Sequence, residues 1–166
     1  MVVSRSVAAL LLLLVAGCGS GEPAGPPDVE VEVGPQQLAV RPVQFCLDGE
    51  GQRYDNTPPV LEVSPGATIS LTVPQSVAER GWAVQVFDEQ LEELIGEVDV
   101  PAGERSFDEI TTDDVVPPAF YLVVVEDKGG DCDEFSGAWP IGFLRAGGDL
   151  SGTPSPASPP TAVPGS

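Results

Sequence analysis

The chain has 166 residues, with 26 acidic side chains against 7 basic ones and no histidine. Its formal net charge of −19 argues against a nucleic-acid-binding protein, because such proteins neutralise phosphates with Lys and Arg. Without histidine, the chain can form no Ser-His-Asp or Cys-His catalytic arrangement, no histidine-bound metal site and no blue-copper centre. We therefore expect a protein that is not an enzyme and that needs no cofactor.

The first 17 residues have the three parts of a secretory signal peptide. Arg5 supplies the positive charge, Val7–Val15 is the apolar segment, and Ala16-Gly17 are the small residues before the cleavage site. The apolar segment is much shorter than the roughly 20 residues that a membrane-spanning helix needs. Because Cys18 directly follows Val-Ala-Gly, the motif is a bacterial lipobox, and we expect Cys18 to carry the lipid and to begin the mature chain. The alternative is an ordinary signal peptide with an incidental cysteine.

A lipid on Cys18 predicts a protein tethered to the outer, extracytoplasmic face of the cell membrane. Two acyl chains give stable anchoring where a single chain is marginal. The mature chain keeps 26 acidic residues against 6 basic ones, which opposes a second attachment to anionic lipids. Residues 18–28 are rich in Gly and Pro and predict a flexible linker. Together with the lipobox, the single lysine and the abundance of Gly and Pro are typical of an actinobacterial protein.

Residues 29–148 have the pattern of a β domain. Val29–Val33 and Thr68–Val73 alternate apolar and polar residues, as half-buried strands do. Phe120–Val125 is apolar throughout, which is typical of a central strand buried on both faces. In chain order, strands are expected at Val29–Val33, Leu38–Leu47, Val60–Val63, Thr68–Val73, Trp82–Val86, Glu97–Val100, Phe120–Val125 and Ile141–Leu144.

About seven or eight short strands separated by Pro- and Gly-containing turns predict an all-β, immunoglobulin-like sandwich. Pro42 lacks a backbone donor, so the Leu38–Leu47 strand is expected at an edge or bulged. One or two helical turns are expected at 75–80 and at 88–94. A true immunoglobulin signature is absent, because Trp82 lies too far after Cys46. Residues 149–166 are rich in Pro and Ser and predict a disordered tail.

Cys46 and Cys132 remain once Cys18 is assigned to the lipid. An even pair of cysteines in an exported protein predicts a disulfide. We expect it to join an early strand to the loop before the last strand. The alternative is two free, buried thiols, and a redox role is disfavoured because there is no Cys-x-x-Cys motif.

Acidic clusters are the remaining candidates for chemistry. Asp88-Glu89 with Glu92-Glu93, Asp113-Asp114, and Asp131 with Asp133-Glu134 could supply oxygen ligands for Ca²⁺, although none has EF-hand spacing. Paired carboxylates could also serve glycoside hydrolysis. In a chain this acidic, a solvated surface is the favoured interpretation, so no metal site is assigned.

The aromatic residues are few, and most are expected to fill the core between the sheets. Tyr54 lies in the polar stretch 49–56 and is the best candidate for an exposed contact.

A set of short motifs resembles one catalogued family. The motifs are Phe45-Cys46-Leu47-Asp48, Val63-Ser64-Pro65-Gly66, Val73-Pro74, Gly81-Trp82, Pro117-Pro118-Ala119-Phe120-Tyr121 and Trp139-Pro140. Together they resemble an actinobacterial lipoprotein family catalogued as domain of unknown function 2771, over roughly Val40 to Arg145. The resemblance implies an envelope lipoprotein with an extracytoplasmic β domain, and it brings no active site with it.

The favoured hypothesis is a lipid-anchored, extracytoplasmic binding or accessory module of the cell envelope, with an envelope protein as its candidate partner. The first alternative is a carrier of a small ligand or cation, which a pocket with convergent polar groups would favour. The second is a carboxylate-dependent cell-wall hydrolase, which a cleft with two facing acids would favour. A closed sandwich with an exposed apolar patch would favour the binding module.

Overall fold

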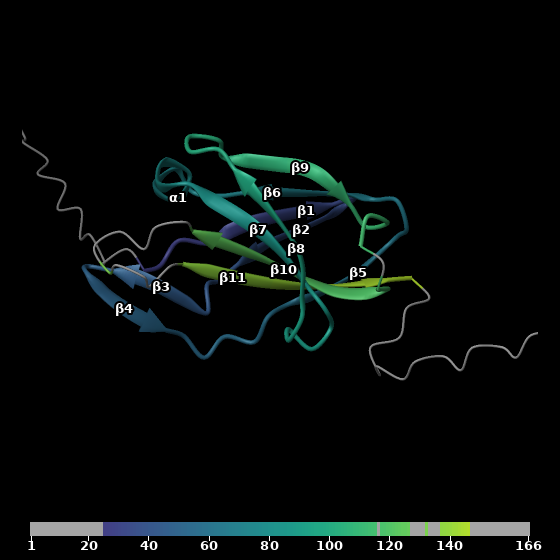
Figure 1. Cartoon of the computed structure of the whole chain (residues 1–166), viewed down its shortest axis with the longest axis horizontal. Helices are drawn as coiled ribbons and strands as arrows, with labels where there is room; N and C mark the ends of the chain where they lie inside the picture. The colour runs from purple at the N-terminus through teal and green to yellow at the C-terminus, as the bar shows by residue number, and fades with distance from the viewer. Residues whose placement is uncertain (1–24, 116, 127–131, 133–136, 147–166) are drawn as a thin grey trace, which may run out of the picture.

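The computed structural model describes residues 25–115, 117–126, 132 and 137–146. Within them the chain forms eleven strands and one short helix (Figure 1). The elements are β1 (Val29–Val33), β2 (Gln36–Val40), β3 (Gln44–Leu47), β4 (Glu50–Arg53), β5 (Val60–Val63), β6 (Thr68–Thr72), α1 (Gln75–Arg80), β7 (Trp82–Phe87), β8 (Leu94–Val100), β9 (Ser106–Thr111), β10 (Ala119–Glu126) and β11 (Ala138–Arg145). The expected signal peptide, Cys18 and the expected tail at 149–166 lie outside the described residues.

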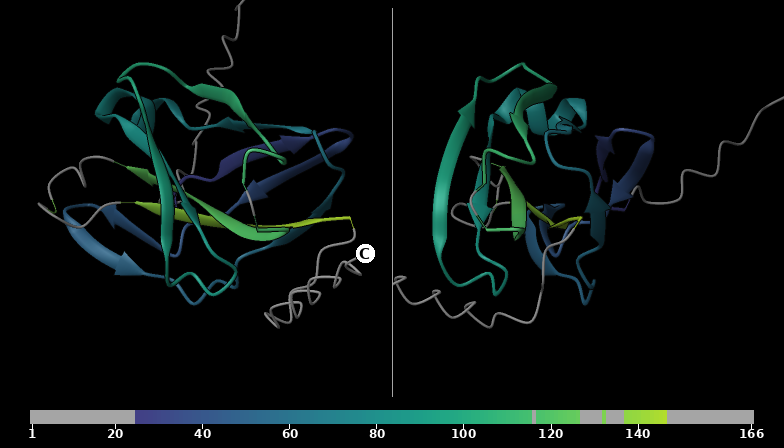
Figure 2. Two further views of the ribbon diagram at one scale, coloured as in Figure 1. Left: turned by 45° about the vertical axis from the view of Figure 1, so that its right-hand side comes forward. Right: turned by 90° about the vertical axis from the view of Figure 1, so that its right-hand side faces the viewer.

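The strands form two sheets that pack face to face (Figures 1 and 2). The smaller sheet has the strand order β2-β1-β6-β9. The larger sheet has the order β4-β3-β11-β10-β7-β8, and β5 lies beside β11 as its seventh strand. The β5–β11 pair is parallel and the other pairs are antiparallel. This arrangement confirms the predicted all-β sandwich.

The second half of the chain follows the strand order of an immunoglobulin-like sandwich. Strands β8, β7, β10 and β11 lie side by side as C′, C, F and G do in variable-type immunoglobulin domains, and β6 pairs with β9 as B does with E. The first half adds two hairpins. The β1–β2 hairpin extends the smaller sheet beyond β6, and the β3–β4 hairpin extends the larger sheet beyond the start of β11.

Alternation explains how the sheets bury one face each. In β1, Val29, Val31 and Val33 are buried, whereas Glu30 and Glu32 are exposed. The central strand β10 is mostly buried on both faces, as its apolar sequence predicts. The largest fully buried side chains include Trp82, Trp139, Phe120 and Phe143.

Aromatic contacts join distant parts of the core. Phe120 stacks on Phe143 with ring centroids 5.3 Å apart. Phe45 and Trp139 pack edge to face, with ring centroids 5.8 Å apart. The Trp139 indole Nε1 donates a hydrogen bond of 2.9 Å to the carbonyl of Pro27. This bond fixes the chain just before β1 to the strand that ends the domain.

Three strands account for the difference between the expected seven or eight and the observed eleven. The expected Leu38–Leu47 strand is divided at Pro42, where the chain leaves the smaller sheet and enters the larger one. Strand β4 is polar and has no alternation, but Asp48 and Gly49 both have positive φ (54° and 77°). Asp-Gly is the typical dipeptide of a two-residue hairpin, so this turn carried the signal for β4.

Strand β9 went unpredicted because a bulge breaks its period of two. Phe107 pairs with Leu71 and Ile110 with Ile69, so two residues of β9 stand opposite the single residue Ser70. Both apolar side chains are buried, although they are three positions apart. The extra residue of a β-bulge produces this spacing.

Of the two expected helical segments, the structure contains one. Helix α1 occupies 75–80 as predicted and ends at Gly81, whose φ is 87°. The expectation for 88–94 was wrong, because this segment is the turn of the β7–β8 hairpin. The Asp88 carboxylate accepts hydrogen bonds from the backbone N–H groups of Glu92 and Glu93, and Leu91 has a φ of 59° that no helix contains.

A substitution at Gly137 tests how tightly this core is packed. A Cβ atom at Gly137 would lie 2.5 Å from the Trp139 ring and 3.0 Å from the Phe45 ring. Gly137→Ala is therefore expected to destabilise the protein by about 1–3 kcal/mol through overpacking. Urea unfolding measures this loss, with Gly96→Ala as the control because no atom lies within 4 Å of a Cβ there. Equal free energies of unfolding for the two variants would contradict the prediction.

Candidate functional site

Of the three cysteines singled out from the sequence, the structure places two. Cys46 on β3 and Cys132, between β10 and β11, form a disulfide across 86 positions of the chain. The predicted pairing and its position before the last strand are confirmed. Both residues are half-buried, so the bond links β3 to the segment that precedes β11.

Glu126, at the end of β10, is a fully buried carboxylate that no pattern in the sequence predicted. Its Oε1 accepts a hydrogen bond of 2.6 Å from Arg80 Nε and forms an ion pair with Arg80 Nη2. Its Oε2 accepts a hydrogen bond of 3.3 Å from the backbone N–H of Gly137. Burial raises the pKa of Glu126, and the Arg80 guanidinium and the Gly137 N–H act in the opposite direction. Because its own chain supplies partners for both oxygens, this carboxylate ties β10 to α1.

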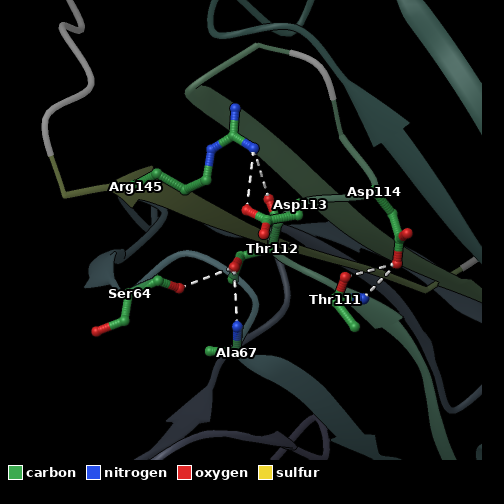
Figure 3. Close-up of polar contacts among 7 residues, drawn as sticks. All are labelled: Ser64, Ala67, Thr111, Thr112, Asp113, Asp114 and Arg145. Carbon is green, nitrogen blue, oxygen red and sulfur yellow. Dashed lines mark hydrogen bonds and ion pairs between the residues drawn. The ribbon is translucent and has the colours of Figure 1, made fainter.

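A second polar network joins the two sheets at the far end of the sandwich (Figure 3). The Thr112 hydroxyl donates to the Ser64 carbonyl at 2.8 Å and accepts from the Ala67 N–H at 3.1 Å. Arg145 Nη1, on β11, donates to the Thr112 carbonyl at 3.1 Å and lies 3.5 Å from Asp113 Oδ1. These contacts hold the chain after β9 against the β5–β6 turn.

Two of the three acidic clusters serve turns. Asp88 closes the β7–β8 hairpin, and Asp114 accepts hydrogen bonds from both the backbone N–H and the hydroxyl of Thr111, which lower the pKa of Asp114. The acids at 131, 133 and 134 lie outside the described residues. In the part of the chain that the structure describes, no group of three or more His, Cys, Asp or Glu residues is arranged to hold a metal ion.

Strand β8 and the turn before it carry four of the five large apolar residues that are exposed in the described part of the chain. We call Leu91, Leu94, Ile95 and Val98 the β8 patch, and these residues are 38%, 49%, 45% and 38% exposed. The strand pairs with β7 on one side. On its other side, no described strand pairs with it, so its backbone edge faces outward (Figure 2, right, the teal arrow at the left).

A groove of about 280 Å³ runs between the edges of the two sheets at this side of the molecule. Its apolar lining comes from Val98 and Val100 of β8 and Phe107 of β9. Acidic side chains surround this lining. Those that line the groove are Asp99, Glu104 and Glu109.

A larger groove of about 370 Å³ lies at the turn between β1 and β2. Its polar side chains include Gln36, Glu62 and Ser64. The Gln36 amide donates to the Glu62 carbonyl at 2.8 Å, so this amide is already engaged within the chain.

The aromatic side chains mostly fill the core, as expected, and Tyr54 differs from its prediction. The structure half-buries Tyr54 against the hydrophobic core, and its hydroxyl donates to Gln52 Oε1 at 3.0 Å. Tyr54 directly follows β4. The β3–β4 hairpin, which was not predicted from the sequence, therefore places Tyr54 against the core.

Among the described residues, no helix has the length and apolar character that crossing a membrane requires.

Comparison with known protein families places the chain beside a family of unknown function. The sequence model of a family described as "Protein of unknown function (DUF2771)" matches residues 22–128 of this chain. The match covers more than half of the chain and includes the strands from β1 to β10. No curated protein and no solved structure matches the chain.

Proposed function

The chain belongs to the DUF2771 family of proteins of unknown function, so its role has to be inferred from the molecule itself, and we propose that it is a lipid-anchored, extracytoplasmic binding or accessory module of the bacterial cell envelope. The resemblance drawn from the motifs began at Val40, whereas the family match begins at residue 22 and ends before β11. The anchor in this proposal is Cys18.

The β8 patch is the observation that supports a binding role. Four large apolar side chains on one edge strand and its turn remain more than a third exposed. An exposed apolar strand edge invites pairing with another chain, and proteins normally cover or shorten such edges. Exposure here therefore favours a surface that a partner covers.

Charge and composition support the remaining parts of the proposal. The 26 acidic residues keep a tethered domain soluble and away from anionic lipid headgroups. The lack of histidine removes the commonest general base and metal ligand, so binding is favoured over catalysis.

The anchor is tested by Cys18→Ala in the native host or a related bacterium. The variant is expected to move from the membrane fraction to the soluble fraction, because the lipid on Cys18 is the proposed attachment. Immunoblotting of the two fractions measures this change. Ser20→Ala is the matched control and should stay with the membrane. A Cys18→Ala variant that still sediments with membranes would show that the anchor lies elsewhere.

A further inference from the structure

We propose that the free edge of β8 binds an extended segment of a partner protein whose residues alternate between apolar and basic side chains. The segment adds to the larger sheet as a strand beside β8. This inference deepens the proposed binding function, since it states the class of partner and the way in which it is held.

The backbone of β8 provides the first requirement. The stretch Gly96–Val100 pairs with β7 in regular register, and the bulge lies before it, where Ile95 is the extra residue. On the other side of this stretch, no described strand pairs with it. An edge strand in this state offers a row of N–H and C=O groups to an incoming strand, which is how β-augmentation gains affinity.

The two faces of β8 determine which side chains the incoming strand needs. Val98 and Val100 pair with Val84 and Trp82, which are fully buried, so this face of β8 points to the groove against Phe107. Side chains of a strand alternate between faces. Alternate residues of the incoming strand therefore lie over this groove, next to its apolar lining of Val98, Val100 and Phe107.

The opposite face of β8 is acidic. Glu97 and Asp99 pair with Gln85 and Ala83 on the outer face of the sheet. Glu97 Oε2 accepts a hydrogen bond from Gln85 Nε2, and Asp99 is exposed. Opposite charges on neighbouring strands stabilise a sheet, and like charges destabilise it. The outward residues of the incoming strand are therefore Lys or Arg.

The same charges disfavour a second copy of this chain at the edge. Pairing β8 with β8 would bring Glu97 and Asp99 of one molecule close to those of the other. The whole chain carries 26 acidic residues against 7 basic ones, so repulsion between copies extends beyond the edge. A basic partner is attracted both by the acidic residues of β8 and by the negative charge of the whole chain. The occupant that remains is the strand of alternating apolar and basic residues.

The experiment uses the full-length chain in detergent and a synthetic peptide of alternating valine and lysine, with binding measured by fluorescence anisotropy. We expect binding that weakens as salt is added, because exposed charges contribute to it. A valine–glutamate peptide is expected not to bind. A valine–lysine peptide N-methylated at alternate residues on the edge facing β8 is also expected not to bind, because it lacks the donors for strand addition.

Matched variants place the binding on β8. Glu97→Lys with Asp99→Lys should weaken binding of the valine–lysine peptide about tenfold or more. Glu30→Lys with Glu32→Lys changes the net charge equally on β1, which is paired on both sides, and should change binding less than about twofold. Val98→Asp tests the groove separately. Melting temperatures verify that each variant is folded.

Three peptide-binding results would overturn the proposal. They are no binding of the valine–lysine peptide, equal binding of its N-methylated form, and equal weakening by the β1 and β8 charge variants. Self-association of the wild type that Val98→Asp abolishes would identify a second copy as the occupant and would also overturn it. None of these results depends on Cys18, so the membrane fractionation still decides the anchor by itself.

Discussion

Arg80→Met is expected to destabilise the folded protein by about 3 kcal/mol at neutral pH. Removing one partner of a buried ion pair leaves an uncompensated buried charge, which typically costs about 3–5 kcal/mol. The lower end of this range applies because the Arg80 side chain is 31% exposed, whereas that of Glu126 is 0% exposed. Urea unfolding of the variant and the wild type measures the difference.

The pH dependence of this loss gives the prediction a second readout. Burial raises the pKa of Glu126 above its usual value, so between these two pKa values the folded protein holds more protons than the unfolded chain. The contribution of this group to stability is therefore full below the unfolded pKa and is lost as pH rises through the folded pKa. Without Arg80 the folded pKa rises further, so the deficit of Arg80→Met should shrink towards acidic pH, where Glu126 is protonated.

Two control variants separate the ion pair from its surroundings. Arg41→Met removes an exposed arginine and should change the free energy of unfolding by less than about 0.5 kcal/mol. Arg80→Met combined with Glu126→Leu removes both charges and should recover most of the lost stability, because apolar replacement of a buried pair is often neutral. If Arg80→Met lowers the free energy of unfolding by the same amount at every pH, the assigned role of Glu126 is contradicted.

Loss of the Cys46–Cys132 disulfide is expected to cost about 2–5 kcal/mol. The bond closes 86 positions of the chain, and such long loops gain most from closure in the chain-entropy model. For a domain with a total stability of roughly 5–15 kcal/mol this is a large fraction. A reducing agent should therefore lower the melting temperature by roughly 10 °C or more.

The double variant Cys46→Ala with Cys132→Ala is the control for this measurement. It should melt at the lower temperature with or without the reducing agent, because it has no bond to reduce. If the wild-type melting temperature is the same in both conditions, the disulfide contributes no stability.

The hydrophobic pattern of the sequence predicted those strands in which the order of apolar and polar residues alone indicates which side chains are buried. Val29–Val33 and Phe120–Val125 show this clearly, because their alternation and their continuous apolar run appear in the structure as expected. The pattern failed where the backbone departs from a regular period. The bulges in β8 and β9 and the break at Pro42 shift the side-chain period, so a count of alternating residues did not reveal β9 or the division of the Leu38–Leu47 strand.

Contacts between residues far apart in the chain could not be predicted for a different reason, which is that they depend on how the elements pack. Glu126 and Arg80 are 46 positions apart, and the pairing of β10 with β7 brings them together, because Glu126 stands opposite Trp82, two residues after Arg80. The disulfide was predictable because the chemistry of exported cysteines allows few partners. The β8 patch was not, since Leu94, Ile95 and Val98 look like core residues until the strand is placed at an edge.

The hydrogen bond from Trp139 to the Pro27 carbonyl has a mechanical consequence for the anchored protein proposed above. A tether at Cys18 transmits any pull on the domain to its first residues. That force acts on the hydrogen bond between the Trp139 indole and Pro27, here called the indole clamp, before it reaches β1. Strand β1 is itself paired with β2 and β6. Detaching the domain from its N-terminal end thus requires rupture of the clamp and of two rows of strand pairing, and resistance to force depends on the rate of that unfolding.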